Sequence, residues 1–384
     1  MAALHFPRII RCGGGALAEL PDAMRQLGLS RPHLITDPYI ASSPLLDRLL
    51  AVLHGADLAY SLFADTVADP TTGAIDAALA AMPPHCDCVL GFGGGSPIDT
   101  AKAVAVRAVR PLPYAEMKVP AAIDEPGLPI VAVPTTAGTG SEATRFTIIT
   151  DEASDEKMLC AGLAFLPSIA IVDFELTLTK PRRLTADTGI DSLTHAIEAY
   201  VSKKANPFSD AMALSAMRLI APNLRQVCAV PDDRAARAAM MEGALHAGLA
   251  FSNASVALVH GMSRPIGAFF HVPHGLSNAM LLPAVTAFSA PAQLRRYADC
   301  ARAMGIAGPE EGDQSAVARL NIELRQLNHD LGVPTPEAYG IAKADWDLRI
   351  PTMAAQALAS GSPANNPRVP SAAEIEALYR ATWS

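Results

Sequence analysis

The chain has 384 residues, of which 50% are hydrophobic and 18% are charged, so it can bury a large core and is not a disordered protein. The net charge is −8 at pH 7 and no block of lysine or arginine stands out, which argues against nucleic acid or an anionic membrane as a partner. No window of about 18 apolar residues is free of charged or strongly polar groups, so we expect no membrane-spanning segment.

The cysteines and the first residues bear on the compartment. The six cysteines are scattered, with neither a disulfide framework nor a CxxC pair, and they are interpreted as reduced, structural thiols. The N-terminal segment lacks an apolar stretch followed by a small-residue cleavage site. Both observations favour a cytoplasmic protein.

Residues 1–180 predict an α/β domain with a parallel, Rossmann-like sheet. Short β-branched runs occur at residues 33–36, 88–91, 129–133 and 168–172. Alanine- and leucine-rich stretches with helical character lie between them, at residues 74–82 and 97–109. Strand, turn, helix and strand at this spacing is typical of parallel sheets.

Residues 181–384 predict an all-helical domain. Apolar periodicity of 3.6 residues dominates, and no comparable β-rich run follows residue 180. The segments with this period are residues 188–202, 208–228, 233–259 and 292–304. We expect His260 to end the third of them, and residues 361–370 to form a loop before a last short helix.

A glycine-rich turn follows the strand at Val89 and Leu90. It reads Gly93-Gly94-Gly95-Ser96-Pro97, and the proline suits the first turn of a helix. Glycines allow the backbone to approach a pyrophosphate, and the free N–H groups of a helix start then face the anion. A turn that binds nothing is the alternative, because a glycine-rich turn alone is weak evidence.

Two further signals fit a dinucleotide. Thr135, Thr136 and Thr139 lie in a turn of small hydroxyl residues and glycines after another buried strand, and they offer donors to a phosphate or ribose. Asp37 follows the strand at residues 33–36, where a carboxylate accepts bonds from ribose hydroxyls and repels a 2′-phosphate. This favours NAD over NADP, although an Asx turn before Pro38 explains Asp37 equally well.

One aspartate and three histidines are candidate metal ligands. Asp191 and His195 are four residues apart in a helical pattern, so their side chains share one face. His260 and His274 come later in the chain. Together the four would suit iron, zinc, cobalt or nickel. A lone histidine is more often structural, however, and spacing does not show that the four side chains converge.

The chain resembles the iron-containing alcohol dehydrogenases, which share the dehydroquinate synthase-like fold. The resemblance spans nearly the whole chain in the right order. It is carried by Gly13-Gly14-Gly15-Ala16, Gly93-Gly94-Gly95-Ser96-x-x-Asp99-x-Ala101-Lys102, Pro134 to Glu142, Gly189-x-Asp191-x-Leu193-x-His195-Ala196-x-Glu198, His260-Gly-Met-x-x-Pro265-x-Gly267, Pro273-His274-Gly275 and Asn366-Pro367-Arg368.

This resemblance implies a cofactor-binding α/β domain, a helical metal-binding domain and a cleft between them. It implies that Asp191, His195, His260 and His274 hold the metal, Fe(II) first and Zn(II) as the alternative. Family contacts to NAD correspond to Asp37, Gly93, Gly94, Gly95, Ser96, Asp99, Thr135, Thr136, Thr139 and Lys157, and the substrate pocket corresponds to Phe146 and Phe251. Homodimers or higher homo-oligomers are also implied.

One position departs from the family pattern. Well-known members carry a further histidine four residues after the one that corresponds to His260, near the nicotinamide and the substrate. Here that position is Arg264, which stays protonated and cannot shuttle a proton as histidine does. We therefore expect proton transfer through His271, water or a ribose hydroxyl, and we expect Arg264 to favour anionic substrates. An Arg264 that points away and pairs with a carboxylate is the alternative.

The predicted function is hydride transfer between NAD(H) and a small alcohol, aldehyde or ketone. Glycerol dehydrogenase-like and dehydroquinate synthase-like enzymes share the architecture, but they use fewer metal-binding side chains than the four present here. A non-enzymatic nucleotide-binding protein has no need of such a metal site.

Overall fold

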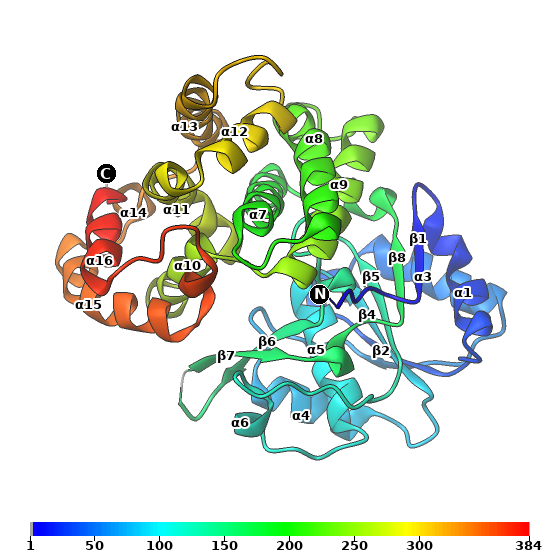
Figure 1. Ribbon diagram of the computed structural model, residues 1–384. Coiled ribbons are helices and arrows are strands. Elements are labelled where there is room, and N and C mark those ends of the chain that lie inside the picture. Colours follow the sequence, from blue (N-terminus) through cyan, green and yellow to red (C-terminus); the bar gives the residue numbers. More distant parts are fainter. Residues whose placement is uncertain (1–2, 155, 384) are drawn as a thin grey trace. The chain divides into compact units, whose positions relative to one another are not determined.

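A computed structural model describes residues 3–154 and 156–383. Tertiary contacts divide this chain into two compact units, residues 4–179 and residues 180–383 with residue 3. The first unit contains a six-stranded parallel sheet, and the second is built from helices (Figure 1). The expected fold class, a parallel α/β domain followed by a helical domain, is confirmed.

The sheet has the order β1-β8-β5-β4-β2-β3, and all its neighbouring strands run parallel. Its strands are β1 Ile9–Cys12, β2 Pro32–Ile35, β3 Ser61–Phe63, β4 Cys88–Gly93, β5 Ile130–Pro134 and β8 Ile169–Val172. The four predicted strands correspond to β2, β4, β5 and β8. The two outer strands β1 and β3 were not predicted, because they are only partly buried and their sequences, IIRC and SLF, form no continuous apolar run.

Helices cover both faces of the sheet. They are α1 Leu20–Gln26, α2 Pro38–Ala41, α3 Pro44–Gly55, α4 Thr72–Ala81, α5 Gly95–Arg107 and α6 Tyr114–Met117. Successive side chains of a strand point to opposite faces, so Leu90 packs into the core that contains Leu49 of α3, while Val89 packs with Val104 of α5. A strand buried on both faces needs a continuous apolar run, which residues 88–92 supply.

Strand order places a switch in direction between β2 and β4. From β2 the chain proceeds outward to β3, then returns to β4 on the other side of β2 and continues to β5. At such a switch, the loops after the two strands leave in opposite directions and open a crevice at their carboxyl ends. Asp37 follows β2 and the glycine turn follows β4, so both predicted cofactor elements lie at the switch point.

A separate antiparallel hairpin was not predicted. It is formed by β6 Phe146–Asp151 and β7 Glu156–Ala161, with Phe146 opposite Ala161. Its strands mix buried and half-buried residues of both polarities, so neither a strict alternation nor an apolar run marks them in the sequence.

Lys102 on α5 anchors the start of this hairpin. Its side chain is fully buried, and its Nζ donates hydrogen bonds to the Thr144 carbonyl at 3.0 Å, the Thr144 hydroxyl at 3.1 Å and the Phe146 carbonyl at 2.7 Å. Burial lowers the pKa of Lys102 to about 8, although the charges of Asp99 and Glu142 oppose that shift. The Lys102 ammonium therefore donates three hydrogen bonds and offsets the negative charges of Asp99 and Glu142.

Replacing Lys102 with methionine should destabilise the protein by about 3–5 kcal/mol, the usual cost of breaking a buried charged network on one side. The substitution keeps the side-chain bulk but leaves the two carbonyls without this donor. Thermal unfolding followed by circular dichroism measures the effect. Lys118→Met is the matched control, because Lys118 forms a partly exposed ion pair with Glu156 and such pairs contribute little. Equal melting temperatures for the two variants would refute the anchoring role.

The second unit consists of helices. They are α7 Arg182–Val201, α8 Pro207–Ala229, α9 Arg234–Ala254, α10 Leu258–Phe270, α11 His274–Ser289, α12 Leu294–Ala303, α13 Asp313–Leu331, α14 Pro336–Tyr339, α15 Lys343–Ala359 and α16 Ala372–Ala381. No strand follows β8 in the described residues. The expected loop at residues 361–370 contains a short 3-10 turn, η6 Ser362–Asn365.

One helix prediction was wrong. The expected single segment 233–259 is interrupted, because α9 ends at Ala254 and Ser255 adopts a positive φ of 75° before α10 begins at Leu258. His260 therefore lies in the first turn of a new helix and does not end the previous one. Apolar residues continue across the interruption, so the periodicity conceals it.

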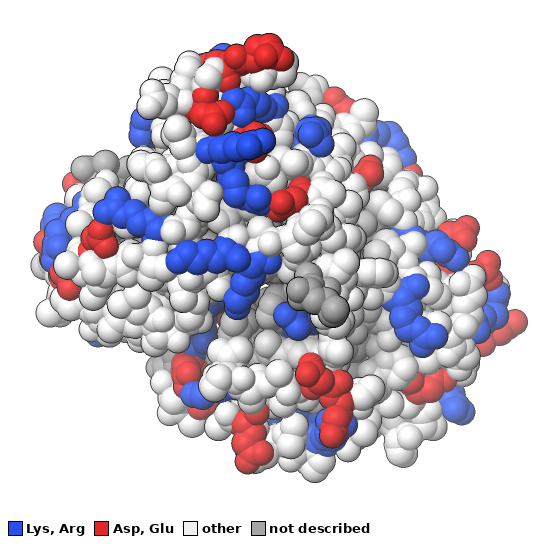
Figure 2. All heavy atoms as spheres, in the orientation of Figure 1, with Lys and Arg blue, Asp and Glu red and all other residues white. Residues whose placement is uncertain are grey.

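Basic and acidic side chains both occur on the face drawn in Figure 2, and residues of other kinds cover most of that face. Among residues 3–154 and 156–383, no helix combines the length and the apolar character that crossing a membrane requires.

Candidate functional site

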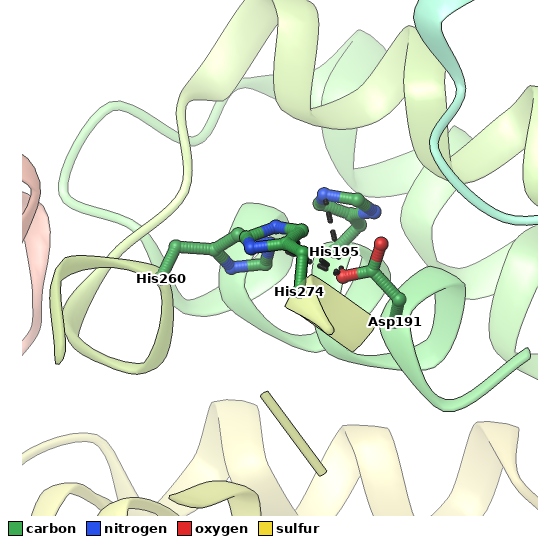
Figure 3. A group of neighbouring side chains, drawn as sticks. All are labelled: Asp191, His195, His260 and His274. Atoms are coloured by element: carbon green, nitrogen blue, oxygen red, sulfur yellow. Dashed lines mark ion pairs between the residues drawn. The ribbon is translucent and has the colours of Figure 1, made fainter. Parts of the chain in front are cut away.

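Asp191 and His195 lie on α7, as their spacing predicted, and both are buried. Figure 3 shows the two side chains directed toward those of His260 and His274. His260 comes from the first turn of α10, and His274 is the first residue of α11. The structure thus brings together all four predicted ligands, from three helices.

Close contact between α11 and α7 positions His274. A Cβ atom on Gly275 would lie only 2.5 Å from the Asp187 carbonyl oxygen of α7. Any larger residue would push the start of α11 away from α7, and His274 with it. The glycine after the histidine therefore has a packing role that fixes a site residue.

The ligand atoms form a tight group. The Asp191 Oδ1 atom is 3.9 Å from His195 Nε2, 3.4 Å from His260 Nε2 and 3.9 Å from His274 Nε2, and all four ligand atoms lie within 4.8 Å of one another. Ligands about 2.1 Å from a tetrahedral metal are about 3.4 Å apart. The donor set and its spacing fit one divalent transition metal ion.

Glu198 and Asn278 support this group. Glu198 accepts hydrogen bonds from His260 Nδ1 at 2.7 Å and from the backbone N–H groups of Ala257 and Val259 at 2.9 and 2.5 Å. It therefore orients an imidazole and caps the start of α10 with the same carboxylate. The Nδ2 atom of Asn278 is 2.7 Å from Asp191 Oδ1 and 3.2 Å from Nε2 of both His260 and His274.

Sequence reasoning assigned no role to Glu198 and Asn278, although their spacing from the predicted ligands indicates one. Asp191, His195 and Glu198 follow at positions i, i+4 and i+7 of one helix, and Asn278 stands four residues after His274. Such spacings place side chains on one helical face. A polar residue on the face of a predicted ligand was therefore a candidate partner of that ligand.

Electrostatics keep the carboxylate of the group ionised. Burial alone would raise the pKa of Asp191, but the charges of His195 and His274 and a hydrogen bond with His260 lower it far below its usual range. Burial opposes the charged form of His260 as well, yet its hydrogen bonds to Asp191 and Glu198 raise the pKa of that imidazole. The site therefore presents a fixed negative charge among imidazole nitrogens.

Three other predicted residues belong to the same unit. Phe251 of α9 stacks on the His195 ring, with ring centroids 4.2 Å apart and an interplanar angle of 16°. Arg264 lies on α10, one helical turn after His260. His271 is exposed in a left-handed conformation at the C-terminal end of α10 and is not among the four clustered residues.

The glycine turn of the first unit forms a cradle beside Asp37. Gly93 has a positive φ of 151°, and a Cβ atom there would lie 2.6 Å from Pro97 Cγ and 3.3 Å from Asp37 Oδ2. The other carboxylate oxygen, Oδ1, accepts a hydrogen bond from Ile40 N at 2.8 Å and caps α2. Asp37 therefore combines the local capping role with a place next to the glycine turn.

The threonine turn after β5 lines the same cradle. A Cβ atom on Gly94 would lie 3.7 Å from Thr136 Cγ2, and one on Gly95 would lie 3.0 Å from Thr139 Cγ2. The Thr135 N–H donates to the Gly93 carbonyl at 2.8 Å, while the buried Thr135 hydroxyl has no hydrogen-bond partner in the described chain. Gly94 caps the start of α5 without a side chain, so the first N–H groups, including that of Ser96, are open to an anion.

Three further residues of the predicted cofactor and substrate sites, Asp99, Lys157 and Phe146, contact other protein groups in the first unit. Asp99 accepts hydrogen bonds from the Ser141 hydroxyl at 2.5 Å and from Ile148 N at 3.1 Å. Lys157 on β7 pairs with Asp69 at 2.8 Å. Phe146 begins β6, where its carbonyl accepts the bond from Lys102. Asp99 and Lys157 thus have protein partners as well as the cofactor role that the resemblance implies.

A glycine cradle at the switch point of a parallel sheet and an Asp-and-three-His group in a helical unit are the two features expected of a metal-dependent, dinucleotide-linked oxidoreductase. Family models support this class directly. The model described as "Iron-containing alcohol dehydrogenase" matches residues 7–174, and that described as "Fe-containing alcohol dehydrogenase family, C-terminal" matches residues 185–383. The chain belongs to the iron-containing alcohol dehydrogenase family.

Individual relatives agree with this assignment. The chain is 38% identical to long-chain-alcohol dehydrogenase 1 of Geobacillus thermodenitrificans (strain NG80-2), over 90% of this chain and 88% of the relative. It is similar to a crystal structure of 1,3-propanediol oxidoreductase, with a TM-score of 0.95, 34% identity and full coverage of both chains. The sulfoacetaldehyde reductase of Bifidobacterium kashiwanohense, solved in complex with NAD+, has a TM-score of 0.89 and 29% identity over 100% of this chain and 99% of that one.

Proposed function

We propose that this protein is an NAD(H)-dependent, metal-dependent alcohol dehydrogenase that catalyses RCH2OH + NAD+ ⇌ RCHO + NADH + H+, or the corresponding reaction of a ketone. The observation that carries the proposal is the convergence of one carboxylate oxygen and three imidazole nitrogens within 4.8 Å. Residues 181–384 would supply this metal centre, and residues 1–180 the cofactor site.

The metal would be held by Asp191, His195, His260 and His274. Fe(II) is the first choice and Zn(II) the alternative, because carboxylate and imidazole ligands suit both ions. When bound, the ion supplies Lewis acidity toward the alcohol or carbonyl oxygen. Family membership supports iron, since the matched family models are named for it.

The surrounding residues have separate tasks. Asp191 contributes the negative charge, and Glu198 holds the proton on His260 Nδ1 so that the Nε2 lone pair is available to the metal. Phe251 packs against His195 and limits the movement of that ring. Proton exchange with water would use exposed His271, because Arg264 keeps its proton at neutral pH.

The cofactor would lie over the glycine and threonine turns. The helix start at Gly95 and Ser96 suits the pyrophosphate, because the residue that caps it, Gly94, has no side chain to cover the first N–H groups. Gly93, Gly94, Thr136 and Thr139 shape the cradle. When bound there, NAD+ would supply the hydride acceptor. Asp99 and Lys157 are assigned to the cofactor by family correspondence, and Phe146 to the substrate pocket.

Hydride transfer tests the proposal. The 384-residue protein is stripped of metal, loaded with Fe(II) or Zn(II) under anaerobic conditions, and mixed with NAD+ and a panel of small alcohols. NADH formation at 340 nm that depends on the added ion is the expected result. Absence of NADH formation with every alcohol and either ion, and of NADH oxidation with the corresponding aldehydes, would contradict the proposal.

Asp37 should select NAD+ over NADP+, because its carboxylate repels a 2′-phosphate. The informative change is Asp37→Asn, which removes the charge but keeps an oxygen that can cap α2. We expect the ratio of kcat/KM for NADP+ to that for NAD+ to rise by about tenfold, equal to about 1.4 kcal/mol of lost repulsion. Steady-state kinetics with both cofactors provides the measurement, and a wild-type preference for NADP+ would overturn the assignment.

The relatives are named for different substrates: a long-chain alcohol, a diol and an aldehyde with a sulfonate group. A small alcohol or aldehyde, with or without an anionic group, is therefore the proposed class. We also propose a homodimer or higher homo-oligomer, as the family resemblance implies, which light scattering on the purified protein would test.

A further inference from the structure

Arg264 lies on α10, the helix that supplies His260 to the metal centre. It follows His260 by four residues on α10, so the two side chains leave the same face of the helix, about 6 Å apart along its axis. Its guanidinium also lies within electrostatic range of Glu198, the carboxylate that orients His260. The side chain retains partial solvent access.

The charge of this arginine is poorly compensated. Among the described residues, its single hydrogen-bond partner is the Ser362 hydroxyl, 3.2 Å from Nη1, and no carboxylate oxygen lies within 4.0 Å. Its Nε–H is buried without a partner. Glu198 forms no ion pair with Arg264 within 4.0 Å, and its oxygens already accept hydrogen bonds from His260 Nδ1 and two backbone N–H groups.

Among the described residues of this unit, the other half-buried arginines pair with carboxylates, whereas the buried Arg237 donates to the Pro231 carbonyl at 2.8 Å and the Thr185 hydroxyl at 3.1 Å. Arg183 pairs with Asp187, and Arg296 pairs with Asp210 while its Nε donates to the Tyr200 carbonyl at 2.7 Å. Burial lowers the pKa of Arg264 to about 10, so the group remains cationic at neutral pH. A cation surrounded by protein without an anion is costly, and a bound anion would offset that cost.

We propose that Arg264 binds an anionic group of the substrate while the reacting oxygen lies at the centre formed by Asp191 and the three histidines. A guanidinium offers a planar fork of N–H donors that matches carboxylate, sulfonate and phosphonate oxygens. The inference rests on the proposed function and names its substrate class: small aldehydes and alcohols that carry such a group.

Helical spacing also limits substrate size. Side chains one turn apart can hold two functional groups of one short molecule, so the anionic group should be separated from the reacting carbon by one to three carbon atoms. Longer spacers should lose the benefit of Arg264, which makes chain length a second variable of the test.

The experiment compares aldehydes of equal chain length that end in a carboxylate, a sulfonate, a phosphonate or a methyl group. The Fe(II)-loaded 384-residue enzyme is given each aldehyde with NADH, and kcat/KM for the reduction is measured. The wild type should prefer the anionic members. In Arg264→Met, the ratio of anionic to methyl-terminated kcat/KM should fall by about 10- to 100-fold, the usual loss for a hydrogen bond to a charged group.

Two further variants control the result. Arg325→Met removes an exposed arginine from α13 and should keep the wild-type ratio. Arg264→Lys keeps the charge without the planar fork and should give an intermediate ratio. If Arg264→Met does not fold, thermal stabilisation of the wild type by methanesulfonate or propionate is measured instead, relative to chloride at equal ionic strength. This stabilisation should be smaller in Arg264→Lys, and equal stabilisation of both proteins would overturn the role of Arg264.

The outcomes separate the two proposals. Turnover of the methyl-terminated aldehyde without preference for any anionic one would overturn the role of Arg264 and leave the dehydrogenase function intact. The same holds if an anionic preference survives unchanged in Arg264→Met. Absence of turnover with every aldehyde would overturn the proposed function, and this inference with it.

Discussion

His274→Ala should lose bound metal and turnover together. The substitution removes one of the three imidazoles. Loss of a residue that merely hydrogen-bonds a metal ligand lowers metal affinity by about 10- to 100-fold, so loss of a ligand itself should lower it further. Catalysis by a bound ion contributes several kcal/mol, so turnover should fall by at least about a thousandfold at limiting Fe(II). Metal analysis after dialysis and steady-state kinetics measure the two losses.

His246→Ala is the matched control for this variant. His246 is a half-buried histidine of α9 in the same unit, it bonds the Ser215 hydroxyl at 3.0 Å, and it lies outside the cluster. It should keep its metal and its turnover. Because the His274 side chain is 37% exposed, added imidazole should restore part of the activity of His274→Ala. Full metal occupancy and turnover in His274→Ala would show that the site assignment is wrong.

The sequence predicts those parts of the molecule that depend on local pattern. The apolar runs at β2, β4, β5 and β8 identify buried strands, and the spacing of Asp191 and His195 places both on one face of α7. Local chemistry also identifies the glycine turn, since glycine, serine and proline after a strand suit a helix start that faces an anion. These inferences require no knowledge of which segments meet.

The parts that sequence reasoning missed depend on distant contacts. The neighbourhood of Asp37 and Gly93 is set by the pairing of β2 with β4, in which partnered residues such as His33 and Val89 are more than 50 residues apart. The interruption between α9 and α10 is stabilised by Glu198 on α7, so the apolar pattern of residues 233–259 carries no trace of it. For the same reason the position of His260 at a helix start was not predicted.

Glu198 combines two functions that one substitution can separate. Its carboxylate accepts from two N–H groups at the start of α10 and from His260 Nδ1. Glutamine has nearly the same shape but only one acceptor oxygen, so in Glu198→Gln at least one of these donors meets an NH2 group. If that donor is His260, the ring would shift its proton to Nε2 to accept from the amide, and the lone pair for the metal would be lost.

Glu198→Gln should therefore weaken metal binding by about 10- to 100-fold and lower stability by about 1 kcal/mol, the usual contribution of a helix cap. Metal affinity from competition with a chelator, and thermal unfolding of the metal-free protein, measure the two effects. The matched control is Asn206→Ala, which removes the cap of α8 in the same unit and should lower stability without changing metal affinity. If both variants lose stability and both retain wild-type metal affinity, Glu198 is a helix cap and does not position His260.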